Sequence, residues 1–369
     1  MSTPTRHTRR LRLLGAAAAS ALVLAACGSG DADTTDGDAT GADDPSTDTS
    51  TGGGSDEGER DLSGTIRAAY LPTGSALPMF LTAEKYADEV GITIEMIPVN
   101  SGNEALTGIA TGQYELGFAG IGSAAYNAFD EGLPVSYVAP MHMGYVEDYF
   151  TLSSTVADSF EAANSLAEDM SDYAGENFAV NGPGVVTEAL LGFALERMNL
   201  STSDINVDFI PFPDQVLALA NGAVVGGILS EPFTSQAEAN GSAYRPWETP
   251  DEPPLPMTGI LYNTEWAEEH PGLADAYMEA FLMSARELNE NGWDTEEMLQ
   301  INEEYTGADP EIVAASRQHH IDPDLNVDLE VTKRYQEFYM EQGQLNYSEL
   351  IPEEQIWNFS WRDRALANS

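Results

Sequence analysis

The chain has 369 residues, in which 61 Asp and Glu outnumber 15 Lys and Arg, and its formal net charge is −46. This charge argues against any nucleic-acid partner, because affinity for phosphate backbones depends on Lys and Arg. The single cysteine excludes an intrachain disulfide framework, a zinc ribbon and an iron–sulfur cluster. With 42% hydrophobic residues, a chain of this length can bury a sizeable core in two domains.

The first 27 residues have the pattern of an export signal. They carry four arginines and no acid, and an apolar run from Leu13 ends in Leu24-Ala25-Ala26-Cys27-Gly28. That ending resembles the lipobox of bacterial lipoproteins, which implies that Cys27 carries the lipid. A coincidental cysteine in an ordinary signal peptide is the alternative. The pair Arg9-Arg10 leaves the general and the twin-arginine export routes both open.

Residues 28–60 are mainly Gly, Ser, Thr, Ala and Asp, with ten acids, one arginine and no aromatic residue. Such a segment buries too little apolar area to offset its ordering entropy, and like charges extend it. It therefore reads as a disordered acidic tether. No later stretch is apolar for about 18 residues. The body is expected to be anchored to the outer face of the cell membrane rather than embedded in it.

The body, residues 61–369, carries 51 acids and ten bases. Salt screens the repulsion among these acids, so the composition predicts a halophilic surface working in concentrated salt. Calcium binding is the alternative, but the sequence has no Asp-x-Asp-x-Asp-Gly loop. Neither a metal site nor a cofactor is predicted.

From Gly64 onward, short apolar runs alternate with helical patterns, which indicates an α/β architecture. Strands are predicted at 65–70, 92–97, 116–119, 135–139, 149–152, 178–181, 207–210, 224–229 and 257–262. The chain after residue 262 is predicted to be helical over about 265–290, 295–305, 309–317 and 327–342.

Loops of small residues follow several predicted strands. In open α/β sheets, ligands bind beyond the carboxyl ends of the strands. Glycine lets a ligand approach the backbone, and Ser, Thr and Asn add polar contacts, although ordinary turns use the same residues. We expect the ligand to contact residues of these loops and of the helices that follow them, namely Thr73, Gly74, Ser75, Asn100, Ser101, Gly122, Ser123, Gly182, Gly184, Thr187, Phe212 and Glu231.

Several phrases match the framework of one family: Ile66–Tyr70, Gly112–Gly117, Asp172–Val180, Gly222–Gly227 and Glu231-Pro232. Over about residues 64–345 the chain resembles the nitrate/sulfonate/taurine and thiamine-precursor (pyrimidine) binding proteins, the solute receptors of bacterial ABC importers. It departs from them where Ala174–Asn177 replaces a frequent Leu-Lys-Gly-Lys, and where Gly222–Gly226 lacks a frequent acid.

The resemblance implies a two-lobed periplasmic-binding-protein fold of the second type. Lobe one would combine residues 61–140 with 257–369, and lobe two would span 141–245. The chain would cross between them near Pro140 and through a hinge at 246–256. A small solute bound between the lobes would favour their closure, and an ABC permease in the membrane would read the closed form. The receptor is expected to be a monomer.

Two ligand classes stay open: a sulfonate-, taurine- or nitrate-like anion, and a pyrimidine- or thiamine-precursor-like heterocycle. Of the ten bases only Arg67 lies near a predicted loop, so an anion would depend on the helix N-termini at Ser75, Ser123 and Gly184. Glu231 instead favours a cationic group or a ring N–H. Five aromatic residues could stack on a ring or belong to the core: Tyr70, Tyr126, Tyr149, Phe212 and Phe233.

Two other functions compete with the receptor. A thiamine-pyrimidine-synthase-like enzyme would share the fold, but that enzyme has a cysteine-rich motif, and the only cysteine here is Cys27. Four histidines of the body show neither metal-ligand spacing nor a catalytic triad: His142, His270, His319 and His320. The adjacent pair His319-His320 is predicted to lie on a helix surface. No enzyme is therefore predicted, and a structural or adhesive surface lipoprotein is the third possibility.

Overall fold

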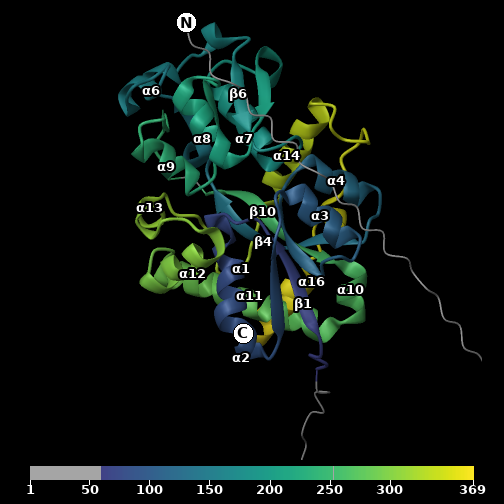
Figure 1. The fold of residues 1–369 in the computed structure, drawn as a ribbon. Helices are drawn as coiled ribbons and strands as arrows, with labels where there is room; N and C mark the ends of the chain where they lie inside the picture. The colour runs from purple at the N-terminus through teal and green to yellow at the C-terminus, as the bar shows by residue number, and fades with distance from the viewer. Residues whose placement is uncertain (1–59, 252) are drawn as a thin grey trace, which may run out of the picture. The chain divides into compact units, whose positions relative to one another are not determined.

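The computed structural model describes residues 60–251 and 253–369, which contain two five-stranded sheets (Figure 1). The predicted signal segment with Cys27, and the tether up to residue 59, lie outside the described residues. None of the helices in the described part is long and apolar enough to cross a membrane.

The first sheet has the strand order β2-β1-β3-β10-β4. Its strands are β1 (Thr65–Tyr70), β2 (Thr93–Pro98), β3 (Leu116–Gly120), β4 (Val135–Gly144) and β10 (Leu255–Asn263). β1 runs parallel to β2 and β3, and β10 runs antiparallel to β3 and β4. Ala69 lies opposite Gly117, where a Cβ would come within 2.6 Å of the Ala69 carbonyl oxygen. Glycine therefore permits this close strand pairing.

The second sheet has the order β7-β6-β8-β5-β9. Its strands are β5 (Phe150–Ser153), β6 (Asn177–Val180), β7 (Asn206–Phe209), β8 (Gly226–Ile228) and β9 (Ala243–Tyr244). β6 is parallel to β7 and β8, whereas β5 is antiparallel to β8 and β9. In both sheets, three parallel strands are therefore followed by one strand of opposite direction and then by a fifth strand that runs parallel to the first three.

Helices connect and cover the strands. Those associated with the first sheet are α1 (Leu77–Leu81), α2 (Ala87–Val90), α3 (Gly102–Ala110), α4 (Ser123–Asp130), α10 (Thr264–Glu269), α11 (Pro271–Asn291), α12 (Glu296–Thr306), α15 (Glu353–Ile356) and α16 (Ser360–Asn368). The others are α5 (Val146–Tyr149), α6 (Phe160–Leu166), α7 (Val186–Arg197), α8 (Phe212–Asn221), α9 (Phe233–Ala239), α13 (Pro310–Ala315) and α14 (Leu329–Glu341). A 3-10 turn at Gly74–Ala76 precedes α1, and a π-helical turn at Thr82–Tyr86 joins α1 to α2.

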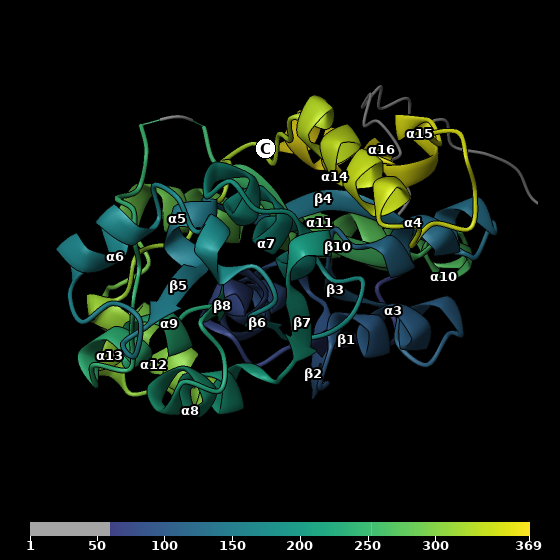
Figure 2. The same cartoon turned by 90° about the horizontal axis from the view of Figure 1, so that it is seen from above.

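The apolar faces of these elements form the core. Ile66, Phe80 and Phe281 are fully buried where the first sheet packs against α1 and α11. A larger cluster joins Phe178 of the second sheet to Tyr335 of α14. Figure 2 shows α14 beside α4 and α7, and its Thr332 carbonyl accepts a 2.7 Å hydrogen bond from the hydroxyl of Tyr126. The helix α14 therefore contacts elements that belong to both sheets.

The alternation of strands and helices confirms the predicted α/β class. β1 begins and ends as predicted, but β4 continues through Pro140 to Gly144. The helix predicted over 265–290 is divided at His270, because Pro271 occupies the first position of a new helix. The strands of the first sheet come from residues 65–144 and 255–263, and those of the second from 150–244. The division into two lobes that move about 246–256 remains a prediction.

Candidate functional site

A cavity with about 580 Å³ of empty space is lined by strands of the first sheet and by loops and helices that adjoin the strands of both sheets, and it is called the inter-sheet cavity here. Its lining residues are Leu71, Thr73, Ser75, Gly102, Phe118, Gly120, His142, Tyr149, Asn181, Val185, Val186, Thr187, Leu190, Phe212, Ser230, Met257 and Thr258.

Strand direction explains why these residues meet. Leu71 follows β1, Gly120 ends β3, Asn181 follows β6 and Ser230 lies two residues beyond β8. The strands β1 and β3 are parallel, as are β6 and β8, so their carboxyl ends lie at one edge of each sheet. The two edges face the same cavity, which is where a binding site is expected in this class of fold.

Among the residues that the structure describes, none with a charged side chain lines the inter-sheet cavity. Asp, Glu, Lys and Arg are absent from the lining residues. In addition, each Lys and Arg within residues 60–369 lies within 4.0 Å of an acidic side chain. An anion in the cavity would therefore be held by hydroxyl and backbone donors rather than by an unpaired cation.

A chain of hydrogen bonds forms one wall of the cavity. Nδ1 of His142 lies 2.7 Å from Oγ1 of Thr258, and Nε2 of His142 lies 3.1 Å from the hydroxyl of Tyr149. The same hydroxyl lies 3.1 Å from Nδ1 of His319. Gly144 makes room for the Tyr149 ring, because a Cβ there would come within 2.7 Å of that ring.

The imidazoles of His142 and His319, which belong to this series of hydrogen bonds, are neutral over the ordinary pH range. Burial lowers the pKa of His142 well below its usual value, and the neighbouring His319 and His320 lower it further. Burial also lowers the pKa of His319 to about 3. Neither ring therefore brings a positive charge to the cavity.

Four of the twelve predicted ligand contacts line the inter-sheet cavity: Thr73, Ser75, Thr187 and Phe212. The hydroxyls of Thr73 and Ser75 lie 2.8 Å apart. Thr187 donates a 2.6 Å hydrogen bond to Oδ1 of Asn181. The predicted aromatic candidate Tyr149 also lines the cavity, and Phe233 stacks on Phe212 with ring centroids 6.1 Å apart.

Three other predicted residues meet at a direct contact between the two halves. The backbone N–H of Ser123 donates to the carbonyl oxygen of Gly184 over 2.9 Å. A Cβ on Gly122 would lie 2.4 Å from that same oxygen. Gly122, Ser123 and Gly184 are therefore brought together, but outside the lining of the inter-sheet cavity.

Gly182, Asn100 and Ser101 also lie outside the lining of the inter-sheet cavity. Gly182 has no atom closer than 3.8 Å to an added Cβ. Ser101 caps α3 by accepting from the N–H of Glu104 over 3.1 Å, and the N–H of Asn100 donates to Oε2 of Glu104 over 2.9 Å. Their neighbour Gly102 lines the cavity instead. This loop illustrates the capping role that the same residue types have in ordinary turns.

Gly74 and Glu231 line a second cavity, called the Trp293 cavity here, with about 390 Å³ of empty space. Its lining residues are Gly74, Leu77, Glu231, Pro232, Trp293, Asp294, Asn302, Val313, Ser316, Arg317, Gln318 and His319. The two cavities share loops, because Thr73 and Ser75 flank Gly74, and Ser230 precedes Glu231.

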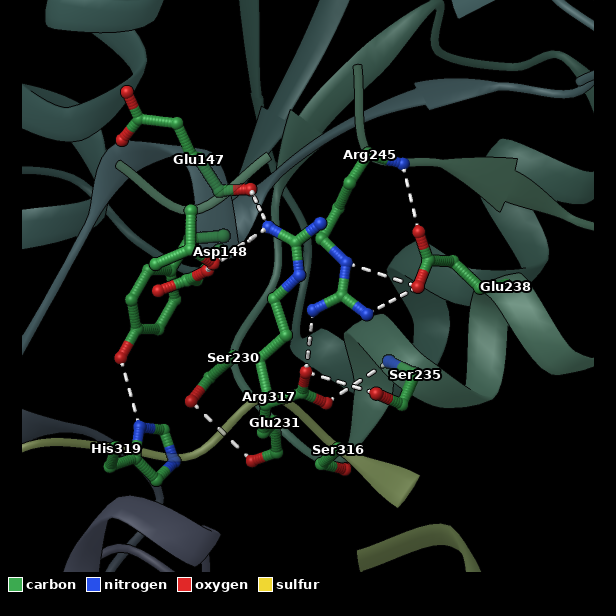
Figure 3. A network of polar contacts seen from close by, with 12 residues as sticks. Glu147, Asp148, Ser230, Glu231, Ser235, Glu238, Arg245, Ser316, Arg317 and His319 are labelled. Carbon is green, nitrogen blue, oxygen red and sulfur yellow. Dashed lines mark hydrogen bonds and ion pairs between the residues drawn. The ribbon is translucent and has the colours of Figure 1, made fainter. Parts of the chain in front are cut away.

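The expectation that Glu231 favours a cationic ligand group was wrong. Its carboxylate forms a buried ion pair with Arg245 at 2.9 Å and accepts 3.0 Å hydrogen bonds from the N–H and the hydroxyl of Ser235 (Figure 3). Burial raises the pKa of Glu231, while Arg245 and Ser235 oppose that rise. The protein itself therefore supplies the positive charge that a ligand was expected to bring. Sequence reasoning missed it because Arg245 lies 14 residues further along the chain.

Arg317 also lies at the Trp293 cavity, which corrects the expectation that only Arg67 lies near a binding loop. Nη1 of Arg317 donates to Asp148 over 3.0 Å and to the Glu147 carbonyl over 3.2 Å (Figure 3). Nη2 donates to the Trp247 carbonyl over 3.1 Å. Arg67 instead pairs with Glu115 and donates to the carbonyl of Gly112.

The expected surface position of His319 was also wrong. Its side chain is buried, with 8% of the residue exposed, because α13 ends at Ala315 and the following loop turns inward. His320 is half-buried, and its backbone pairs with Met143. Two of the aromatic candidates belong to the core: Tyr70 packs against Phe80, and Tyr126 is fully buried.

Several lining residues were not among the predicted contacts. Asn181 directly follows β6, and Ser230 stands in a loop that sequence analysis noted for its neighbour Glu231. Their positions after strands are the signal that could have found them. No comparable signal marks His142 and Thr258, which lie within β4 and β10 and meet only through antiparallel pairing of these strands.

A family model described as the NMT1-like family matches residues 63–301 of this chain. The chain belongs to the NMT1-like family. No curated protein sequence matches this NMT1-like protein. In residues 60–251 and 253–369, no group of three or more His, Cys, Asp or Glu side chains is arranged to hold a metal ion.

Solved structures establish the fold of this NMT1-like protein. The ligand-binding component of an ABC-type import system from Staphylococcus aureus, with zinc bound, has a TM-score of 0.68 at 14% identity, covering 82% of this chain and 98% of its own. The periplasmic nitrate-binding protein NrtA from Synechocystis PCC 6803 has a TM-score of 0.66 at 15% identity, with coverages of 82% and 88%.

The alkanesulfonate-binding protein SsuA from Xanthomonas axonopodis pv. citri, bound to MOPS, has a TM-score of 0.61 at 17% identity and covers 81% of this chain and 99% of its own. At sequence identities this low, the similarity shows a shared fold only. The periplasmic-binding-protein fold and the family resemblance expected from the sequence are therefore confirmed.

Proposed function

We propose that this NMT1-like protein is an extracytoplasmic solute-binding protein of an ABC importer. It captures a small molecule between a lobe formed by residues 61–140 and 257–369 and a lobe formed by 141–245, and delivers it to a permease. The observation that carries this proposal is the inter-sheet cavity, to which strand ends of both sheets contribute. A solute there touches both halves at once and favours the arrangement in which they meet.

The ligand class that fits best is a neutral heterocycle of the pyrimidine or thiamine-precursor kind. The lining combines apolar side chains such as Leu190 and Met257 with hydroxyl, amide and imidazole groups, and none of its side chains carries a formal charge. Tyr149 and Phe212 offer aromatic surface to a ring. Catalysis forms no part of this proposal.

A sulfonate-, taurine- or nitrate-like anion is the second candidate. Val186 and Thr187 begin the 12-residue helix α7 and line the cavity, so backbone N–H groups at a helix start are available to an anion. This arrangement needs no unpaired cation, and it agrees with the pairing of every described Lys and Arg.

The proposal also places the receptor at the outer face of the membrane through a lipid on Cys27, with residues 28–60 as its tether. This part rests on the sequence pattern alone. Metabolic labelling with a radioactive fatty acid tests it: the native chain should be labelled, and Cys27→Ser should lose the label and appear in the medium or periplasm. Equal labelling of both chains would contradict the lipid anchor.

The experiment for the receptor is native purification in concentrated salt, release of any bound molecule and its identification by mass spectrometry. Calorimetric titration with the recovered compound, or with a pyrimidine, taurine and nitrate, then gives the affinity. Thr187→Val removes a hydroxyl from the cavity and should weaken binding about tenfold. Thr107→Val, which changes an exposed threonine of α3, is the matched control and should bind normally. Equal affinities of both variants would contradict the proposed site.

A further inference from the structure

The Trp293 cavity contains a buried hydrogen-bonding atom that has no partner. Nε2 of His319 has no hydrogen-bond partner among the described residues, and it is shielded from water because only 8% of this residue is exposed. Its other nitrogen, Nδ1, lies 3.1 Å from the hydroxyl of Tyr149 (Figure 3). An unpaired buried polar atom is energetically unfavourable, so a ligand that pairs with Nε2 would recover stability.

A second nitrogen lies close to this atom. Asn302 is 2% exposed, and its Oδ1 accepts a 2.9 Å hydrogen bond from Thr306, so Nδ2 is its remaining donor. A Cβ added to Gly74 would lie 3.4 Å from Nδ2 of Asn302 and 3.7 Å from Nε2 of His319. The two nitrogens therefore lie beside the same small volume, which the absence of a side chain at Gly74 leaves free.

The cavity is suited to an uncharged molecule. The carboxylate of Glu231 is paired with Arg245, and the guanidinium of Arg317 is paired with Asp148. The remaining charged lining residue, Asp294, is exposed to solvent. Leu77, Pro232, Trp293 and Val313 supply apolar surface.

We propose that the Trp293 cavity is a second binding compartment for a small cyclic amide, a lactam. The lactam N–H donates to Nε2 of His319, and the adjacent lactam C=O accepts from Nδ2 of Asn302. The ring packs against Trp293 and Leu77. A cyclic amide carries a donor and an acceptor side by side on one edge, which matches the acceptor and donor that the two side chains present.

This binding would fix the hydrogen-bond direction along the wall between the two cavities. When Nε2 of His319 accepts, the neutral ring carries its proton on Nδ1 and donates to the hydroxyl of Tyr149. Tyr149 then donates to His142, and Nδ1–H of His142 donates to Thr258. The hydroxyl hydrogen of Thr258 is left free for a solute in the inter-sheet cavity. This coupling rests on the proposed function, whereas lactam binding itself does not.

The test uses 2-pyridone as the probe and the native chain, followed by calorimetry and by ¹⁵N NMR of labelled histidines. We expect saturable binding and a shift of His319 to its Nδ1–H tautomer. N-methyl-2-pyridone, which lacks the N–H, should bind about tenfold more weakly. His319→Asn keeps a side-chain donor for the hydroxyl of Tyr149 but leaves no atom at Nε2, and should also weaken 2-pyridone binding about tenfold. His320→Gln, at the neighbouring half-buried histidine, is the control and should bind normally.

Three results would overturn the proposal: no binding of 2-pyridone, equal binding by His319→Asn, or loss of binding in Thr187→Val instead. The last result would place the probe in the inter-sheet cavity. If His319→Asn fails to fold, the NMR titration of the native chain decides, because an unchanged His319 resonance contradicts the proposed contact. If 2-pyridone does not bind the Trp293 cavity, solute binding in the inter-sheet cavity is still tested by Thr187→Val. The two proposals can therefore be contradicted separately.

Discussion

Nη1 of Arg317 lies 3.0 Å from Oδ1 of Asp148, and this ion pair joins the loop after α13 to the crossing between β4 and β5. The same guanidinium donates to the carbonyl of Trp247, in the crossing between β9 and β10. One side chain therefore holds both crossings between the sheets. If the sheets move as lobes, Arg317 lies where that movement is controlled.

Arg317→Met should lower the free energy of unfolding by about 3 kcal/mol, because it leaves the buried Asp148 without its cationic partner. Urea unfolding in concentrated salt measures this change. Arg286→Met is the matched control, since Arg286 and Asp324 are 40% and 54% exposed and such pairs contribute about 0–1 kcal/mol. Equal losses in the two variants would show that the Arg317 pair has no special structural role.

The buried histidines should make stability depend on pH. Burial lowers the pKa of His142 and His319 in the folded state, so below about pH 6.5 the unfolded chain binds protons that the folded chain does not. Stability is therefore greatest above that pH and falls as the pH decreases. Between about pH 7.5 and 5.5, each of these histidines should remove about 1.4 kcal/mol.

His319→Asn isolates one of these contributions. Because the variant loses one titrating group, its loss of stability over this pH interval should be about 1.4 kcal/mol smaller than that of the native chain. Denaturant unfolding at both pH values measures the difference, and any pH-independent effect of the substitution cancels. His270→Asn, at an exposed histidine, is the control. If the stability of the native chain and that of His319→Asn depended on pH in the same way, His319 would not be a neutral, buried histidine.

Gly122→Ala should disturb the contact between the two halves. The new Cβ would lie 2.4 Å from the carbonyl oxygen of Gly184, so the hydrogen bond from Ser123 to that oxygen has to open. We expect about tenfold weaker solute binding, with the secondary structure unchanged in circular dichroism. Gly182→Ala meets no atom closer than 3.8 Å and should bind like the native chain. Normal affinity in Gly122→Ala would mean that this contact does not take part in capture.

Salt should stabilise the fold. The many acidic side chains of the body repel one another at low ionic strength. Raising NaCl from about 0.1 M to about 2 M shortens the electrostatic screening length from about 10 Å to less than 3 Å. The melting temperature should rise by several degrees. An uncharged osmolyte at equal osmolality separates screening from changes in water activity. An equal rise with both additives would contradict the electrostatic explanation.

Local sequence patterns were sufficient to predict most of the strands and helices. Alternation and turn residues predicted β1 to the residue, whereas the strand predicted over 178–181 included Asn181, which the structure places directly after β6. They also identified four residues of the inter-sheet cavity, because strand ends converge in any open α/β sheet. The two helices α15 and α16 were not predicted, although both pack against the first sheet and its helices.

Partners that are distant in the sequence explain the errors at the site. Glu231 looked available for a ligand until the fold placed Arg245 against it. The adjacent pair His319-His320 was predicted to lie on a helix surface, whereas α13 ends at Ala315 and the loop after it carries His319 to Tyr149, 170 residues earlier in the chain. Such pairings depend on the topology of the chain, which periodicity does not encode.

Hydrogen–deuterium exchange, with and without the solute recovered from the native protein, tests the central claim most directly. If the solute is held between the halves, the loop 71–75 after β1 and the segment 181–187 before and within α7 should become protected together, since both line the inter-sheet cavity. Protection confined to the segments of one sheet, or no protection in either, would contradict capture between the two sheets.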